Sequence, residues 1–212
     1  MKRKTIIAVF ISTILFGGIA SAQETHPDHI WSLDLNNKNV TIGLYGGLTG
    51  SYFELSGNDA GLLSYQLGFA VNQKFGFGLA GSGLAYDQPL NNVVSDGTYH
   101  VNSGWTGGYI ERIFTLAPRL KTSLMWQSGR GVYFYRYDHE YRADKLWYEE
   151  IIDGDNYFVN KPTIKAHFRI AGNWWIGAEA AYTLASPVKV INTDEKLMSG
   201  LSYGISLSYG IF

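Results

Sequence analysis

The final stretch of the chain, residues 197–212, alternates between larger apolar side chains and small polar ones. The apolar positions are Leu197, Leu201, Tyr203, Ile205, Leu207, Tyr209 and Ile211, and the positions between them include Ser202, Gly204, Ser206, Ser208 and Gly210. This period of two predicts a β-strand with one apolar and one polar face. A strand of a soluble sandwich turns charged residues to water, but this polar face carries none. Small polar side chains suit the interior of a narrow barrel and apolar ones suit lipid, so the stretch is typical of a transmembrane strand.

Seven earlier segments show the same alternation. They cover residues 39–52, 62–72, 75–86, 98–113, 119–137, 157–171 and 174–185. In every segment we expect the large apolar residues to face lipid and the small or polar ones to face the interior. In segment 98–113 this places Trp105 and Tyr109 outside and His100 inside. Together with the last stretch, the pattern predicts eight strands.

The connections between these strands alternate in length. Short connections fall at residues 72–74, 114–118 and 172–173, and long ones at 53–61, 87–97, 138–156 and 186–196. Bacterial outer-membrane barrels have an even number of strands, short periplasmic turns and longer external loops. The sequence therefore predicts an all-β fold, a transmembrane antiparallel up-and-down β-barrel of eight strands. A ten-stranded barrel is the alternative, with a turn at 128–131 and an added strand at 145–152, but it needs a charged periplasmic turn at 138–144.

Residues 1–22 have the features of a cleaved signal peptide. Basic residues at positions 2–4 precede an apolar run, and Ala-Ser-Ala at 20–22 forms an A-x-A cleavage site. We expect residues 23–38 to form a short periplasmic segment and residues 39–212 to form the barrel. Loss of three positive charges with the signal peptide takes the formal net charge from −1 to −4, which offers no surface for nucleic acid. The chain has no cysteine, which excludes a lipoprotein anchor, disulfide bonds and a thiolate metal site.

The alternating strands and the terminal aromatic residue Phe212 resemble the small eight-stranded outer-membrane β-barrel proteins of the OmpA and OmpX type. The resemblance covers most of residues 39–212 and rests on pattern, since Phe212 falls out of phase with the apolar face that ends at Ile211. It implies export to the outer membrane of a Gram-negative bacterium, where outer-membrane lipid and lipopolysaccharide surround the barrel. It also implies that the outer-membrane insertion machinery recognises the C-terminal strand ending at Phe212.

Four charged residues, Lys121, Lys165, Arg169 and Glu179, fall on expected interior faces, together with His167. A charge inside a narrow barrel within lipid must be paired or hydrated. We therefore expect Glu179 to pair with Lys165, Arg169 or both, in a structural network that fills the lumen. A gated pore or a ligand pocket lined by these residues is the alternative. The sequence predicts no cofactor and no metal site.

Outer-membrane enzymes that deacylate lipid A carry a His-x-Ser pair, in which the histidine activates the serine. In this chain Arg169 stands where that serine would follow His167, although Glu179 lies downstream. We therefore predict a non-enzymatic outer-membrane protein that is structural or binds an external glycan or protein ligand through its loops. A narrow, porin-like solute channel is the first alternative, and a lipid A-modifying enzyme is the second.

The longest predicted loop is rich in acidic and aromatic residues. Tyr133, Tyr135 and Tyr157 border it and are expected to form either an aromatic girdle at the membrane interface or a contact surface. Residues 153–156, Asp-Gly-Asp-Asn, predict a tight turn, because Asp-Gly favours hairpin turns.

Overall fold

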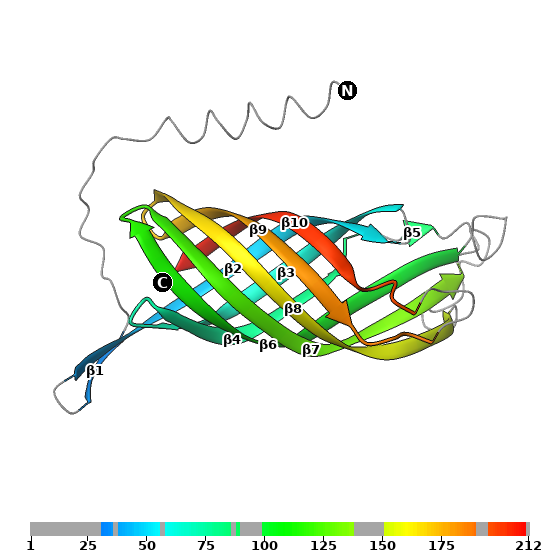
Figure 1. Cartoon of the computed structure of the whole chain (residues 1–212), viewed down its shortest axis with the longest axis horizontal. Coiled ribbons are helices and arrows are strands. Elements are labelled where there is room, and N and C mark those ends of the chain that lie inside the picture. The colour runs from blue at the N-terminus through cyan, green and yellow to red at the C-terminus, as the bar shows by residue number, and fades with distance from the viewer. Residues whose placement is uncertain are drawn as a thin grey trace, which may run out of the picture.

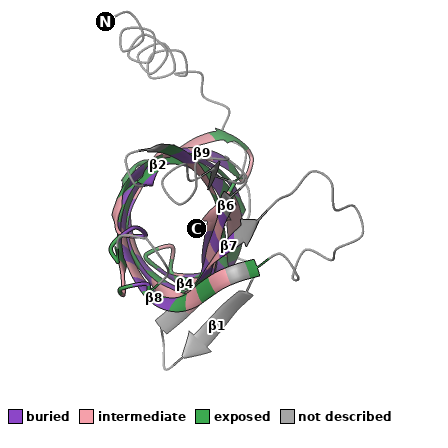
Figure 2. Ribbon diagram, turned by 90° about the vertical axis from the view of Figure 1, so that its right-hand side faces the viewer, coloured by how far each residue is buried: buried purple, intermediate pink, exposed green. Residues whose placement is uncertain are grey.

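Eight strands form a closed antiparallel barrel in the computed structural model, which describes residues 31–35, 38–55, 58–85, 88–89, 99–137, 151–189 and 195–210 (Figure 1). The barrel strands are β2 (Lys38–Leu55), β3 (Asn58–Val71), β4 (Phe75–Leu84), β6 (Tyr99–Ala117), β7 (Leu120–Tyr137), β8 (Ile151–Ala171), β9 (Trp174–Ala185) and β10 (Gly200–Gly210). Each pairs with the next along the chain, and β10 pairs with β2, which closes the ring (Figure 2). The predicted all-β, up-and-down transmembrane barrel of eight strands is therefore confirmed. Within the described residues, no helix is long and apolar enough to cross a membrane.

Two short strands lie beside the ring. β1 (Trp31–Leu35) forms a hairpin with the first residues of β2, and Trp31 pairs with Ile42 (Figure 1). β5 (Gln88–Pro89) pairs only with β6. Each of these short strands pairs with one barrel strand and is not part of the ring, so the number of strands in the closed barrel remains eight.

The short connections lie together at one end of the barrel, which we call the periplasmic end, as the sequence predicts (Figure 1). They comprise residues 72–74, 118–119 and 172–173. In the first of them, Asn72 and Gln73 have positive φ angles of 51° and 54°, and Lys74 N donates a hydrogen bond to Val71 O at 3.0 Å. Positive φ at both central residues defines a type I′ turn, whose twist matches that of two antiparallel strands.

Three of the four connections at the opposite, external end are long, as predicted. The exception is the first, predicted at residues 53–61. β2 and β3 stay paired as far as Leu55 and Asn58, so only residues 56–57 separate them. The predicted long loop is wrong because Phe53 and Leu55 point into the barrel and are only 2% and 1% exposed, which keeps the two strands together.

Three neighbouring strands are longer than a bilayer requires. β6, β7 and β8 contain 19, 18 and 21 residues, against 12 in β9 and 11 in β10. About 9–11 residues suffice for a tilted strand to cross, so these three are long enough to continue past the bilayer. Figure 1 shows them reaching further than β9 and β10 at the external end. β7 runs unbroken through residues 128–131, which rules out the ten-stranded alternative. Residues 153–156 pair with β7 inside the β8 ladder, so the turn predicted there is wrong. The β7–β8 connection falls instead within residues 138–150, outside the described residues.

The outward side chains form an apolar surface around the barrel. On β10, Ile205 and Leu207 are 67% and 48% exposed, whereas the inward Ser206 is 3% exposed. Exposed apolar side chains on other strands include Leu48, Leu67, Phe77, Leu79, Leu124, Ile164 and Tyr182. Such a continuous apolar surface matches hydrocarbon and not water. The predicted facing is confirmed for seven of the eight strands.

The exception is β6, which faces the opposite way from the prediction. Trp105 and Tyr109 are buried, whereas Ile110 is 67% exposed. Trp105 and Tyr109 supply volume opposite the small residues of β3 and β4, where a Cβ at Gly68 would collide with the Tyr109 hydroxyl. The rule that large apolar residues face lipid fails here because the narrow interior must also be filled. The side chain of His100, predicted to point inward from this strand, lies outside the described residues.

An apolar core fills the external half of the interior. Its buried members include Phe53, Leu55, Val101, Tyr133, Tyr135, Tyr157 and Val159, together with Val188, Leu197 and Met198 from the segment between β9 and β10. Leu197 is therefore not lipid-facing as predicted, because β10 begins only at Gly200 and Leu197 lies in the turn before it. The three tyrosines predicted for a girdle or a contact surface are likewise inside. The segment before this turn is fixed to β8, since Lys189 N donates to Asp155 Oδ2 at 2.9 Å.

Candidate functional site

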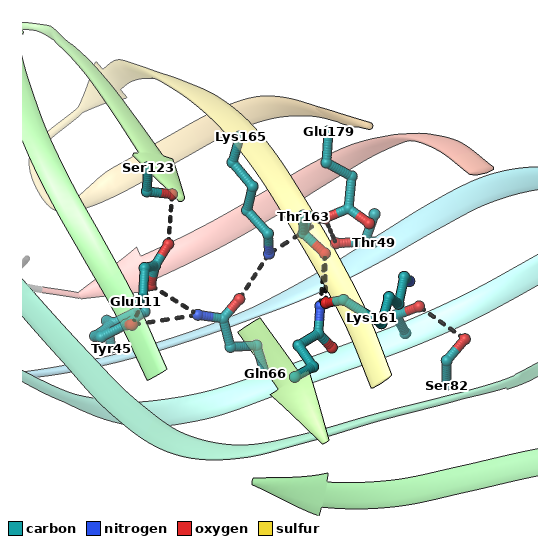
Figure 3. A network of polar contacts seen from close by, with 12 residues as sticks. Tyr45, Thr49, Gln66, Ser82, Glu111, Ser123, Lys161, Thr163, Lys165 and Glu179 are labelled. Atoms are coloured by element: carbon teal, nitrogen blue, oxygen red, sulfur yellow. Dashed lines mark hydrogen bonds and ion pairs between the residues drawn. The ribbon is translucent and has the colours of Figure 1, made fainter. Parts of the chain in front are cut away.

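β8 and β9 place an ion pair inside the barrel, between the apolar core and the periplasmic end. Lys165 and Glu179 lie directly opposite each other in register, and both point inward. Their Nζ and Oε2 atoms are 3.2 Å apart, and the side chains are 6% and 3% exposed (Figure 3). Glu179 also accepts a hydrogen bond from Thr49 Oγ1 at 3.4 Å. The carboxylate thus has one cation and one hydroxyl donor in place of water.

A second buried acid, Glu111 on β6, belongs to the same group of contacts. Tyr45 OH and Ser123 Oγ donate to its two oxygens, each at 2.5 Å. Gln66 on β3 joins the two acids, because its amide nitrogen donates to Glu111 at 3.2 Å and its amide oxygen accepts from Lys165 Nζ at 2.7 Å (Figure 3). We call this group the interior charge cluster: Tyr45, Thr49, Gln66, Glu111, Ser123, Lys165 and Glu179. It connects six of the eight strands across the lumen.

Sequence reasoning missed Glu111, because the predicted facing of β6 placed this side chain toward lipid, whereas the structure places it inside. A signal was present in the sequence. A carboxylate on the lipid face of a spanning strand is costly, and Ile110 and Phe114 supply an apolar face on the other parity of the strand. The cost of a lipid-facing carboxylate at Glu111 argues for the orientation found in the structure. The large size of Trp105 and Tyr109 argues for the opposite orientation, and the first argument is the correct one.

Lys121 and Arg169 lie away from the cluster, nearer the periplasmic end. Lys121 Nζ donates to Gln73 Oε1 at 3.1 Å and lies 5.2 Å from the ring centroid of Trp175. Arg169 Cζ lies 4.7 Å from the same ring. Trp175 is 1% exposed, so both cations contact a ring that is withdrawn from water. The four charged residues predicted for one network therefore divide into the Lys165–Glu179 pair and two cations around Trp175.

Lys161, which the sequence reasoning also missed, lies two inward positions from Lys165 on β8, toward the external end, and is 1% exposed. A cavity of about 20 Å³ adjoins it, lined also by Trp105, Tyr157 and Phe53. A cavity of this volume holds about one water molecule. The lumen is therefore filled at the border between the interior charge cluster and the apolar core.

The cluster has the chemistry of a cross-link between strands. Among the described residues, the buried charged side chains are Glu111, Lys121, Lys161, Lys165 and Glu179. The part of the chain that the structure describes contains no group of three or more metal-ligating side chains. Ser123 Oγ donates to Glu111 and not to a histidine, so this serine lacks the histidine base that activates a nucleophile.

Comparison by sequence gives no match for this chain, either to a protein-family model or to a curated protein. Comparison by structure does give matches. The chain is similar to the crystal structure of Neisserial surface protein A (NspA), with a TM-score of 0.54 and 8% identity, over 82% of this chain and 98% of that one.

Two further similar structures have lower TM-scores. The N-terminal β-barrel domain of Pseudomonas aeruginosa OprF gives 0.46 at 11% identity, over 79% of this chain and 96% of that one. The attachment invasion locus protein Ail of Yersinia pestis, in complex with the heparin analogue sucrose octasulfate, gives 0.45 at 11% identity, over 80% and 97%. At these identities it is the fold that is shared. The similarity to NspA confirms that this chain has the fold of the small eight-stranded outer-membrane β-barrels.

Proposed function

We propose that this chain is a non-enzymatic outer-membrane protein with a closed interior, which binds a glycan or protein ligand through its external end. The filled lumen is the observation that carries the proposal. The interior charge cluster connects strands across the barrel, and the cavity beside Lys161 holds about one water molecule. A solute crossing the barrel would have to displace both the cluster and the apolar core above it.

The external end is where a ligand would bind. β6, β7 and β8 continue past the length that crosses a bilayer, and they carry outward polar residues there, including Asn102 and Asn156. Variable loops on a rigid scaffold are the usual carriers of binding function. Residues 138–150 connect two of these strands and are rich in acidic and aromatic residues.

Export and insertion complete the proposal. Residues 1–22 would direct export and be removed, residues 23–38 would remain in the periplasm, and the strand that ends near Phe212 would be recognised by the insertion machinery. Outer-membrane lipid and lipopolysaccharide would then cover the exposed apolar surface. A lipid A-modifying role is disfavoured because Arg169, which stands in the place of the nucleophile, lies over the ring of Trp175.

Fractionation tests the location. The mature protein should appear in the outer-membrane fraction, shortened by about 22 residues according to its signal-peptide pattern. Unboiled samples should migrate differently from boiled ones on a denaturing gel, because a folded barrel resists detergent until it is heated. Recovery in the soluble periplasm would overturn the proposal.

Two assays separate binding from enzymatic activity. Mass spectrometry of lipid A from cells with and without the protein should show identical species, and a change in acylation would make the protein an enzyme. A glycan array and a panel of surface proteins should be probed with the purified barrel and with a variant in which a short Gly-Ser linker replaces residues 138–150. Binding that persists unchanged in this variant would move the ligand site away from the β7–β8 connection.

A further inference from the structure

A pocket lies in the outer wall of the barrel, on the side that faces the membrane. Its volume is about 490 Å³, and its lining includes Leu63, Tyr65, Thr106, Arg130, Val132 and Asn156 around a floor that contains Gly83 and Gly104. Gly83 and Gly104 are directly opposite each other on β4 and β6. A Cβ at either residue would have its nearest contact at 3.4 Å, so a side chain would fit there. The two glycines leave open a space that larger residues would fill, and they let a ligand approach the backbone closely.

The lining of this outer-wall pocket combines polar and apolar side chains. Tyr65 reaches across to Thr106, with 2.6 Å between their hydroxyl oxygens. Arg130 is exposed on the outer face, and its cross-strand neighbours are Thr106 and Phe158, neither of which carries a charge. The pocket therefore presents a guanidinium, hydroxyl groups and the Asn156 amide together. Guanidinium groups match phosphate oxygens with two parallel hydrogen bonds.

The pocket lies at the border between the apolar surface and the external end. Gly83 is the residue before the end of β4, whose other end follows a periplasmic turn. On β6 and β7 the outward residues below the pocket are apolar, as at Ile110 and Trp126, which are 67% and 47% exposed. At the level of the pocket the outward residues of these strands include the polar Thr106 and Arg130 beside the apolar Val132, and Ser128 Oγ donates to Asn160 Oδ1 at 3.1 Å. Polar side chains first join apolar ones here, as expected at the level where headgroups of the external leaflet would meet the barrel.

We propose that this pocket binds the phosphorylated glucosamine headgroup of lipid A, with a phosphate against Arg130 and a sugar ring over the Gly83–Gly104 floor. The inference rests on the proposed outer-membrane location, because lipid A is the anionic glycolipid of that membrane's external leaflet. Arg130 supplies the charge complementarity. Thr106 and Asn156 supply hydrogen-bonding partners for sugar hydroxyls, and the apolar surface below receives the acyl chains.

The chain contains one matched control for Arg130 and another for the glycine floor of the pocket. Arg112 is the outward arginine on the neighbouring strand β6, but its Cζ lies 4.1 Å from the Phe75 ring, beside a periplasmic turn. Gly108 is an outward glycine on the same strand as Gly104, and a Cβ there would have its nearest contact at 3.6 Å. Arg130→Gln and Gly104→Leu therefore test the site, and Arg112→Gln and Gly108→Leu test charge and bulk elsewhere on the outer wall.

Native mass spectrometry of the refolded barrel in detergent, titrated with bisphosphorylated lipid A and with the same lipid lacking its phosphates, measures the binding. The unmutated barrel should prefer the phosphorylated form by at least about tenfold, as expected for hydrogen bonds to a charged group. Arg130→Gln should abolish that preference, and Gly104→Leu should weaken binding of both lipids. The two control variants should bind like the unmutated barrel, and phosphatidylglycerol should not displace lipid A.

Each opposite result overturns the inference. It fails if Arg130→Gln retains the phosphate preference, if Arg112→Gln loses it equally, or if phosphatidylglycerol competes as well as lipid A. All variants are first checked for heat-modifiable migration, so that a misfolded barrel is not scored as a loss of binding. Failure of this binding test leaves the location intact, whereas recovery in the periplasm overturns the location whatever the barrel binds in detergent.

Discussion

Lys165 Nζ lies 3.2 Å from Glu179 Oε2, and the two residues face each other in register across β8 and β9. Because Lys165 also donates to Gln66 Oε1 at 2.7 Å, the pair is tied to β3 on another part of the ring. Both side chains are more than nine-tenths buried, so neither can exchange its partner for bulk water. Removing one member should therefore leave the other charge without adequate compensation.

Glu179→Gln should lower the free energy of unfolding by up to about 3–5 kcal/mol, because Lys165 would keep its charge in a buried site. Replacing both residues, as in Glu179→Gln with Lys165→Met, should restore much of this loss. Urea unfolding of the refolded barrel measures both effects. Glu195→Gln is the control, since Glu195 is exposed and its loss should matter little. A Glu179→Gln barrel as stable as the unmutated one would show that the pair does not hold the barrel together.

Leu207 and Ser206 test the facing of β10. Leu207 is 48% exposed and should touch lipid, so Leu207→Arg should cost about 2–4 kcal/mol if it lies near mid-membrane. Ser206 is 3% exposed inside the barrel, where an arginine would be destabilising by overpacking. A lipid-soluble quencher should reach a fluorophore attached at position 207 and miss one at 206. The reverse pattern would mean that the barrel is turned inside out.

Tyr109 and Ile110 test the orientation of β6, which the sequence alone assigned incorrectly. Tyr109→Ala should open a cavity in the interior and cost about 3–5 kcal/mol, the range for large buried aromatic residues. Ile110→Ala should cost clearly less, because Ile110 already lies against lipid in the folded barrel. Unfolding measurements on the two variants give the comparison. If Ile110→Ala were the more destabilising change, the strand would face as the sequence pattern indicated.

Asp155 should make the attachment of the β9–β10 segment depend on pH. Its carboxylate accepts hydrogen bonds from Lys189 N at 2.9 Å and Asn156 N at 2.8 Å, in the part of β8 beyond the bilayer. These bonds, that from Lys189 first, lower the pKa of Asp155 below its ordinary value of 3.8. Because the folded-state pKa is the lower one, the stabilisation is complete above about pH 3.8 and is lost as the pH falls through the folded value.

Hydrogen exchange measures this attachment. After correction for intrinsic rates, protection of the Lys189 amide should be high at neutral pH and should fall as the pH drops through the folded-state pKa of Asp155. Asp155→Asn keeps the acceptor oxygen without the titrating charge, so its protection should change much less with pH. Equal loss of protection in the two proteins would assign the effect to another group.

Most of the fold could be predicted from the sequence, because a period of two with an uncharged small-residue face admits few structures. The turn at 172–173 and the bounds of β9 follow directly from that pattern. The facing of β6 did not follow from the sizes of its side chains, since Trp105 and Tyr109 fill an interior whose need for volume depends on Gly68 and its neighbours on other strands. Within the strand, only the cost of placing the Glu111 carboxylate toward lipid indicated the correct orientation.

The candidate site was less predictable than the fold for the same reason. The inward positions of Lys165 and Glu179 follow from alternation within their own strands, but their contact depends on the register between β8 and β9. Gln66 joins the two acids across the lumen from a strand 99 residues away from Lys165 in sequence. The contacts of Lys121 and Arg169 with Trp175 likewise depend on the shape of the closed ring.

The central claim is that side chains block the lumen of the barrel. Conductance across a planar lipid bilayer tests this claim most directly. The refolded, unmutated protein should give no discrete conductance steps, because the interior charge cluster and the apolar core occupy the lumen and the cavity beside Lys161 holds about one water molecule. The NspA-like fold leaves open either a plugged or a hydrated interior, so the recording is decisive. Stable unitary steps whose ion selectivity changes in Glu179→Gln would contradict the account and make this barrel a channel.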